Sequence, residues 1–248
     1  MKTFLLLIAV AGAAGTCRFP PQLWCSSKEI AIQCKVYQQC KESVWTVKTN
    51  AALVEFELYF ESLCPDCRNF IKTQLFPTYT KVGSIMNITL VPYGNAREKQ
   101  SGDRWVFTCQ HGEQECIGNL LETCAIHTLK SIDRIMPFIH CMELSEYPLQ
   151  SVQSCSQQLS VPLDPIMFCY NTTVGNTLEH KMAQKTEALI PPHKYVPWVV
   201  LNGVHTEKIN DEAARDLMKL VCDTYTGTKP SACTATRAQL TGCAQSDL

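Results

Sequence analysis

The chain has 248 residues, of which 46% are hydrophobic and 18% are charged, and its formal net charge is −1. This balance is typical of a folded globular protein and excludes global disorder. A net charge near zero, without a long run of Lys or Arg, also argues against nucleic-acid binding, which needs a basic surface.

Cysteine is the unusual residue, because the chain contains 15 of them. Cytosolic thiols are kept reduced, so cysteines at this density indicate disulfides that form in an oxidising compartment. The sequence leaves their pairing open.

Residues 1–15 have the pattern of a signal peptide, with Lys2, an apolar run over residues 4–10 and small residues over 11–15. The apolar run is too short to span a membrane, and no later run reaches spanning length, so we expect no membrane span. Asn87, in Asn-Ile-Thr, and Asn171, in Asn-Thr-Thr, are predicted glycosylation acceptors on the secretory route.

Residues 16–48 form a short Cys-rich segment. Four cysteines within about thirty residues could close two disulfides, which would stabilise a piece too small to hold a core of its own. They are Cys17, Cys25, Cys34 and Cys40.

Residues 49–222 are predicted to form one α/β domain that begins with a strand at 53–60. A Cys-Pro-Asp-Cys motif at 64–67 follows this strand, and a helical pattern continues to Leu75. Pro77 should end that helix, because the residue before a proline is pushed out of the helical region. A second strand at 87–91 completes a βαβ unit.

The rest of the chain alternates helical and strand patterns. Residues 97 to about 159 are mostly helical by pattern, and we interpret residues 97–175 as an insertion, followed by a helix at 177–189. A strand at 197–201, a tight turn at Asn202-Gly203 and a partner strand at 204–209 come next. Asn210 should cap a last helix, and residues 223–248 are interpreted as a loosely ordered tail that processing could remove.

This order of elements is that of a thioredoxin-like fold, and it places the motif where a helix begins. A cysteine there faces unpaired N–H groups and the positive end of the helix dipole, which lower its pKa. Cys64 is therefore the candidate nucleophile that attacks a substrate disulfide, and Cys67 is the candidate resolving thiol. Arg68 is the nearest cation in the sequence and Asp66 would oppose a thiolate, so the size of the shift stays open.

Pro197 precedes Trp198 at the start of the third strand of the domain. Thioredoxin-like proteins carry a cis-proline at this place, packed against the active-site cysteines, so Pro197 is a candidate for that role. The alternative is a proline that merely opens a strand.

Other groups of reactive residues support weaker interpretations. Cys109, Cys116, Cys124 and His127 could be taken for metal ligands, but cysteines in an oxidising compartment pair more often, so no metal site is expected. No local signature supports a Cys/His protease. Four histidines have no partner in the sequence and are interpreted as surface or core residues: His140, His180, His193 and His205.

Three cysteines near the end of the chain, Cys222, Cys233 and Cys243, are an odd number. One of them could stay free or bridge two chains, so a disulfide-linked dimer of the precursor is a hypothesis.

The run from residue 109 to 124 resembles the signature of gamma-interferon-inducible lysosomal thiol reductases, and the resemblance extends from about residue 53 to 222. Residues 16–48, with Trp24 and Trp45 beside their cysteines, are similar to a saposin A-type module. The signature residues are Cys109, Gln110, His111, Gly112, Glu115, Cys116, Asn119 and Cys124.

The resemblance implies a thiol reductase that reduces disulfides in proteins at acidic pH in endosomes and lysosomes and assists antigen processing for MHC class II presentation. It implies a precursor that is also secreted, and sorting by a mannose 6-phosphate receptor that binds the glycans. Cys64 and Cys67 match the active pair of the family. No metal or organic cofactor is implied, so an external small thiol should supply the reducing equivalents.

Two alternatives remain open. One is an oxidase or isomerase of the secretory pathway. The other is a non-catalytic Cys-rich binding protein in which a bridge between Cys64 and Cys67 is structural.

Overall fold

The computed structural model describes residues 24–25, 28–41 and 51–234, and the chain divides into two compact units, Met1–Lys48 and Thr49–Leu248. The expected signal peptide lies outside the described residues. In the first unit, helices α1 (Lys28–Gln33) and α2 (Tyr37–Cys40) are tied by a Cys25–Cys40 disulfide. Cys34 is buried and disulfide-bonded as well, so disulfides contribute much of the stability of this small unit.

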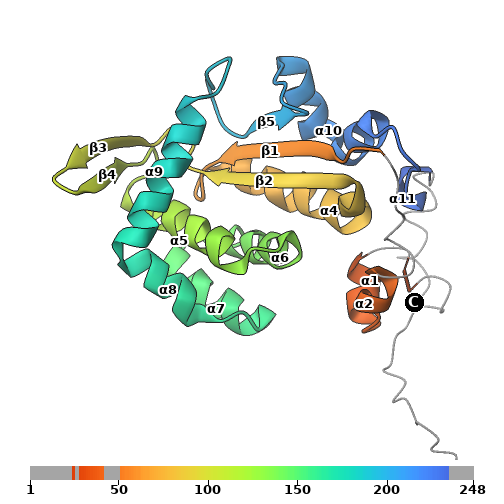
Figure 1. The fold of residues 1–248 in the computed structure, drawn as a ribbon, viewed down its shortest axis with the longest axis horizontal. Helices are drawn as coiled ribbons and strands as arrows, with labels where there is room; N and C mark the ends of the chain where they lie inside the picture. Colours follow the sequence, from red (N-terminus) through yellow and green to blue (C-terminus); the bar gives the residue numbers. More distant parts are fainter. Residues whose placement is uncertain (1–23, 26–27, 42–50, 235–248) are drawn as a thin grey trace, which may run out of the picture. The chain divides into compact units, whose positions relative to one another are not determined.

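The second unit contains a three-stranded sheet in the order β2–β1–β5 (Figure 1). Strand β1 (Val54–Phe60) pairs in parallel with β2 (Met86–Pro92) and antiparallel with β5 (Trp198–Leu201). A helical crossover joins β1 to β2, and helix α10 (Glu207–Thr224) follows β5. This topology confirms the thioredoxin-like α/β fold, with a helical insertion between β2 and β5.

Strand β1 places alternate side chains on opposite faces of the sheet, as any strand does. Phe56, Leu58 and Phe60 lie in the main hydrophobic core of the unit, together with side chains from the helices between β1 and β5 and from α10. Tyr59 points to the other face, where a smaller cluster forms. That cluster contains Tyr59, Val91, Trp198 and Val200.

The helix after the Cys-Pro-Asp-Cys motif does not end at Pro77, so that prediction is wrong. Helix α3 (Pro65–Phe70) continues through a π-helical turn (Ile71–Leu75) into α4 (Phe76–Val82). The wide turn places Pro77 within the first two positions of α4, where a missing N–H leaves no carbonyl unpaired. The backbone can therefore pass the proline without leaving the helix.

The insertion begins with a β-hairpin rather than a helix. Strands β3 (Arg97–Ser101) and β4 (Arg104–Thr108) pair antiparallel, and Gly102, with a φ of +63°, allows the tight turn between them. Helices α5 (Glu113–Leu129), α6 (Ile132–Met142), α7 (Pro148–Leu159), α8 (Leu163–Asn171) and α9 (Thr173–Glu187) follow. Helix α9 is the one expected at 177–189, and it contacts the hairpin and β2 (Figure 1).

Three disulfides connect the six cysteines between β4 and α9. Cys109–Cys116 closes the loop before α5, and two longer links join helices to one another. Cys124–Cys169 joins α5 to α8, and Cys141–Cys155 joins α6 to α7.

The strand expected at 204–209 is reduced to a single bridge between Leu201 and Val204. The turn itself matches the prediction, because Asn202 and Gly203 both have positive φ. The cap of α10 is Thr206, whose hydroxyl accepts a hydrogen bond from the Ile209 N–H at 3.1 Å. The helix therefore starts before Asn210, the predicted cap.

Residues 223–234, which the sequence analysis assigned to a loosely ordered tail, pack on the domain. A disulfide joins Cys222 to Cys233, α11 (Ser231–Thr234) contacts α4, and Tyr225 is buried. Cys243 lies outside the described residues, so the hypothesis of a disulfide-linked dimer now concerns that residue.

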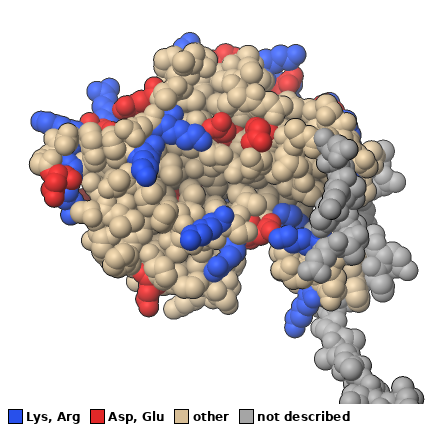
Figure 2. Space-filling view, viewed as in Figure 1, with Lys and Arg blue, Asp and Glu red and all other residues tan. Residues whose placement is uncertain are grey.

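Figure 2 shows described Lys and Arg side chains interspersed with acidic ones on the face in view. Within the described ranges, no helix has both the length and the apolar character needed to cross a membrane.

Candidate active site

Cys64 and Cys67 lie at the start of α3, directly after β1 and a short turn. Cys64 is the N-cap residue, and its Sγ accepts a hydrogen bond from the Cys67 N–H at 3.5 Å. Pro65 occupies the first turn, where a proline loses no hydrogen bond. Over the described part of the chain these are the free cysteines, and Cys64 is 7% exposed whereas Cys67 is 0% exposed. Solvent therefore reaches Cys64 first.

The loop before β5 lies against Cys64. The Val196–Pro197 peptide bond is cis, as predicted, and the Cys64 Sγ is 4.0 Å from the Val196 carbonyl oxygen. The cis bond that Pro197 forms therefore belongs to the segment that contacts the sulfur.

The two thiols have opposite pKa shifts. A hydrogen bond from the Cys67 thiol is the largest influence on Cys64. Together with the N–H groups of Cys67 and Asp66 and the charge of His111, it lowers the pKa of Cys64 to about 6, although burial opposes the shift. Burial raises the pKa of Cys67 well above its usual range, and its bond to Cys64 raises it further. The pair is polarised so that Cys64 carries the negative charge.

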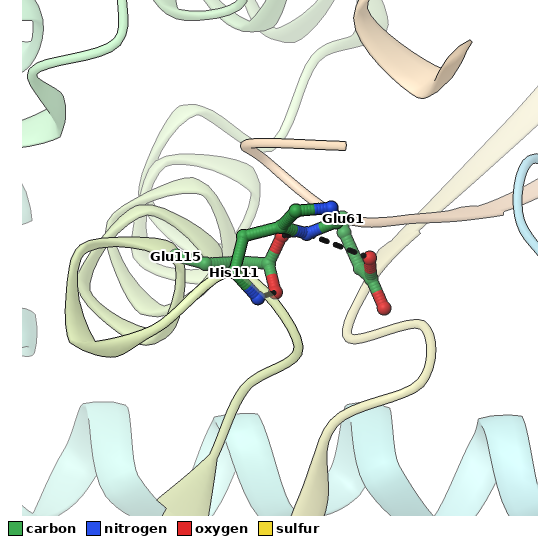
Figure 3. A group of neighbouring side chains, drawn as sticks. All are labelled: Glu61, His111 and Glu115. Atoms are coloured by element: carbon green, nitrogen blue, oxygen red, sulfur yellow. Dashed lines mark hydrogen bonds and ion pairs between the residues drawn. The ribbon is translucent and has the colours of Figure 1, made fainter. Parts of the chain in front are cut away.

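Glu61, His111 and Glu115 form a carboxylate–histidine cluster (Figure 3), and Glu61 lies three residues before Cys64 in the chain. The His111 Nδ1 lies 2.5 Å from Glu115 Oε2 and 3.4 Å from Glu61 Oε2. Both carboxylates are fully buried, whereas the His111 side chain is 33% exposed. Glu61 is the first residue of the turn that leads into Cys64, because the Cys64 N–H donates a hydrogen bond to the Glu61 carbonyl at 3.3 Å.

The spacing of the cluster is also that of a cation site, since its three ligand atoms lie within 4.8 Å of one another. A hydrogen bond already joins two of these atoms, His111 Nδ1 and Glu115 Oε2, whereas Glu61 Oε2 has no hydrogen-bond partner among the described residues. The 2.5 Å contact holds a proton between His111 and Glu115, and a bound cation would have to displace that proton. The cysteines once considered as ligands, Cys109, Cys116 and Cys124, are in disulfides.

The signature residues hold the loop and the helix that carry this cluster. The Cys109–Cys116 disulfide and the positive φ of Gly112 fold the loop that carries His111, whose N–H donates to Glu115 at 3.0 Å. Three further signature residues tie this loop to its neighbours. Gln110 accepts from Asn95, Asn119 accepts from the Ser62 N–H at 2.9 Å, and Cys124 bonds to Cys169 on α8.

Two glycines allow close approach at the cysteine turn. A Cβ on Gly94 would lie 2.4 Å from the Glu61 Cγ, and a Cβ on Gly118 would lie 2.2 Å from the Ser62 Oγ. Helix α5 and the turn after β2 can therefore pack directly against residues 61–64.

A second pair of carboxyl groups is buried behind the cysteines, Glu122 on α5 and Glu143 at the end of α6. Burial raises the pKa of Glu122 to about 8 and that of Glu143 well above its usual range. Neither carboxyl oxygen of Glu143 has a hydrogen-bond partner among the described residues, and burial together with the charge of Glu122 favours the protonated form of Glu143. Arg68 donates to the Glu143 carbonyl at 2.9 Å and forms an ion pair with Glu146.

The remaining predicted residues lie away from the cysteines or on the surface. Asn87 on β2 and Asn171 at the end of α8 are exposed, as glycan acceptors must be. The four unassigned histidines have neighbours in the fold. His140 stacks on Phe76, His180 on Trp105 and His205 on Trp198, while His193 hydrogen-bonds the backbone of Gly94.

Sequence reasoning named the two cysteines, Pro197 and the signature residues as candidates, but it did not single out Glu61, Glu122 or Glu143. Glu61 had a usable signal, because an acidic residue directly before the motif and after an apolar strand is costly to bury without a purpose. The two carboxyls on α5 and α6 had none, since their meeting depends on how two helices pack.

Comparisons with known proteins identify the family of the chain. The family model "Gamma interferon inducible lysosomal thiol reductase (GILT)" matches residues 55–159, and the model "Saposin A-type domain" matches residues 14–46. Among solved structures, DsbA of Chlamydia trachomatis superimposes with a TM-score of 0.46 at 15% identity, over 69% of this chain and 86% of that one.

Two curated relatives carry the name gamma-interferon-inducible lysosomal thiol reductase. The protein of Carassius auratus is 46% identical over 220 residues, which is 88% of this chain and 84% of the relative. The protein of Mus musculus is 39% identical over 213 residues, 85% of this chain and 83% of the relative. The chain is therefore a thiol–disulfide oxidoreductase that belongs to the gamma-interferon-inducible lysosomal thiol reductase family.

Proposed function

We propose that this protein reduces disulfide bonds of protein substrates at acidic pH, with Cys64 as the nucleophile and Cys67 as the resolving thiol. The observation that carries the proposal is the polarised pair at the start of α3, in which the pKa of Cys64 is lowered to about 6. At pH 5 such a thiol is about one-tenth ionised, whereas an ordinary thiol is ionised to roughly one part in ten thousand. The pair thus retains a useful thiolate fraction in acid.

The reaction proceeds by two exchanges. The Cys64 thiolate attacks one sulfur of the substrate disulfide, so that a Cys64–substrate disulfide forms and the other substrate sulfur leaves as a thiolate that takes up a proton. Cys67 then loses its proton and attacks Cys64, which releases the second substrate thiol and leaves a Cys64–Cys67 disulfide. Two electrons and two protons have passed to the substrate. An external small thiol, oxidised to its own disulfide, restores the pair.

The acidic endosome and lysosome lumen is the proposed place of action, with antigen processing for MHC class II presentation as the proposed role. Support comes from the lowered pKa of Cys64, the exposure of Asn87 and Asn171, and the names of the relatives. Glycans at these two positions would allow sorting by a mannose 6-phosphate receptor, with part of the precursor secreted. Microscopy of the tagged chain against a lysosomal marker tests the compartment.

The reaction is tested by reduction of a denatured disulfide-bonded protein at pH 5 and pH 7. We expect activity at pH 5 in the natural chain, complete loss in Cys64→Ser, and an accumulating mixed disulfide in Cys67→Ser, because the resolving thiol is missing. Both variants should keep the thermal stability of the natural chain.

Activity confined to pH 7 would instead indicate an oxidoreductase of the secretory pathway. No activity at either pH, with Cys64 unreactive toward alkylation, would favour a binding protein with a structural bridge.

A further inference from the structure

No atom of the carboxylate–histidine cluster takes part in the two exchanges just described, yet its carboxylates are buried and its side chains are closely held. Glu61 is 0% exposed, and one of its oxygens accepts from the Asn95 N–H at 2.6 Å. Its other oxygen has no hydrogen-bond partner within the described ranges and faces His111 at 3.4 Å. Burying a carboxyl with one unpartnered oxygen costs free energy, because that oxygen has lost its hydrogen bonds to water.

His111 is held in one orientation. Glu115 accepts from both the backbone N–H and the ring Nδ1 of His111, and the Cys109–Cys116 disulfide closes the loop around it. The Ser62 hydroxyl donates to the Glu115 carbonyl at 3.1 Å, which attaches the start of α5 to the turn that leads into Cys64. His111 therefore keeps a fixed position relative to the cysteine.

We propose that His111 and Glu61 are positioning residues that adapt Cys64 to acid. The protonated imidazole, held by Glu115, stabilises the negative sulfur, and Glu61 stays neutral in acid but becomes a competing anion near neutrality. This inference rests on the proposed function, because it explains how the same nucleophile retains its charge at low pH.

The order of proton release supports this assignment. Burial, together with the charge of Glu115, raises the pKa of Glu61 to about 7, which is above the value of about 6 for Cys64. Burial alone would lower the pKa of His111, but the hydrogen bond and charge of Glu115 outweigh it and the net shift is upward. As pH rises, Cys64 ionises first, while Glu61 is still neutral and His111 is still charged.

The other ionisable groups around Cys64 do not supply this cation. Cys67 is a neutral donor, Arg68 pairs with Glu146, and Glu143 is kept protonated by burial. Burial lowers the pKa of His193, and Asp66 acts on Cys64 through its backbone N–H. His111 is the cationic side chain that lowers the pKa of Cys64.

The test follows the ionisation of Cys64 itself in the full chain, by the pH dependence of its alkylation with the modified peptide identified by mass spectrometry. In His111→Gln we expect the midpoint to rise by about one pH unit, so that alkylation at pH 5 is about tenfold slower. His111→Arg should restore the natural midpoint in large part, because it returns a positive charge. In Glu61→Gln the midpoint should stay close to that of the natural chain, because Glu61 is neutral while Cys64 ionises, and the upper part of the curve should narrow to that of a single site.

His180→Gln is the matched control. Like His111, His180 forms an ion pair with a glutamate, Glu98, at 2.7 Å, but it lies on α9, apart from the cysteines. Its loss should leave the Cys64 midpoint unchanged.

An unchanged midpoint in His111→Gln would overturn the inference. So would a shift that accompanies a lower melting temperature and is not rescued by His111→Arg, because that result indicates a structural role. The measurement reads the Cys64 charge without a substrate, so it stays decisive if the protein reduces no protein disulfide. Active reductase with an unmoved midpoint would reject this inference alone.

Discussion

The sheet and the insertion of the larger unit contribute different things to one site. Strand β1 and helix α3 provide the two sulfur atoms, and both remain unpaired. The insertion holds three disulfides and provides charge: His111 and Glu115 before and on α5, and the carboxyls of Glu122 and Glu143 behind the cysteines. The comparison teaches that the reacting atoms depend on local sequence, whereas their ionisation depends on segments about fifty residues further along the chain.

The largest expected loss of stability comes from removing a disulfide of the insertion. The Cys124–Cys169 link spans 45 positions, so its replacement by serine at both ends should lower the free energy of unfolding by about 4 kcal/mol through loop entropy. Chemical denaturation measures this loss. Replacement of the Cys109–Cys116 link, which spans 7 positions, should cost about 2–3 kcal/mol but should also release His111. Equal losses from the two replacements would contradict the loop-entropy argument.

A smaller effect should appear as a pH dependence of stability. Glu61 has a pKa of about 7, and Glu122 and Glu179 have pKa values of about 8, each raised chiefly by burial. A carboxyl whose pKa is raised in the folded state binds its proton more tightly there than in the unfolded chain. Its stabilising effect is therefore complete below the unfolded value, near 4.5, and declines as pH rises toward the folded value.

Stability should accordingly fall by at least about 2 kcal/mol between pH 5 and pH 8, which corresponds to a melting temperature lower by about 4–8 °C. Calorimetry at the two pH values measures it. Glu122→Gln should flatten the dependence, because its amide cannot ionise. A protein that is more stable at pH 8 would show that these carboxyls are hydrated rather than buried.

The smallest expected change in stability comes from removing one buried hydrogen bond. A hydrogen bond to the cysteine turn is compared with one in the hairpin. Asn119→Ala leaves the Ser62 N–H buried without its acceptor and should cost about 1–2 kcal/mol, with a loss of reductase activity. Asn176→Ala is the control, since Asn176 bonds both the N–H and the carbonyl of Trp105 in the hairpin. It should cost similar stability and leave activity unchanged. If activity falls equally in both variants, the connection between α5 and the turn has no special importance.

Local patterns predicted the sheet half of the molecule well. The alternation in β1, the Asn202-Gly203 turn and Pro197 follow from rules that act within a few residues. The same rules failed where tertiary packing decides. The π-helical turn carries the helix past Pro77, and the partner strand expected after Gly203 shrinks to one bridge because Thr206 begins α10 early.

The carboxyls of the site could not be predicted for the same reason. Glu122 and Glu143 read as ordinary polar residues of helical segments, and only the crossing of α5 and α6 brings them together. The approach of His111 to Glu61 depends on Gly94 and Gly118, at which a side chain would collide with the cysteine turn. The spacing of residues along the sequence does not predict such contacts.

The burial of the Cys124–Cys169 disulfide protects it from reduction by the thiols with which the enzyme works. Both of its sulfur-bearing residues are nearly inaccessible to solvent, at 0% and 3% exposure. In thiol–disulfide exchange a thiolate must reach one sulfur of the disulfide. A buried disulfide therefore persists in the presence of thiols that reduce exposed disulfides. Steric shielding then protects this link, because a thiolate cannot reach its sulfur atoms, whereas it can reach an exposed disulfide of an unfolded substrate.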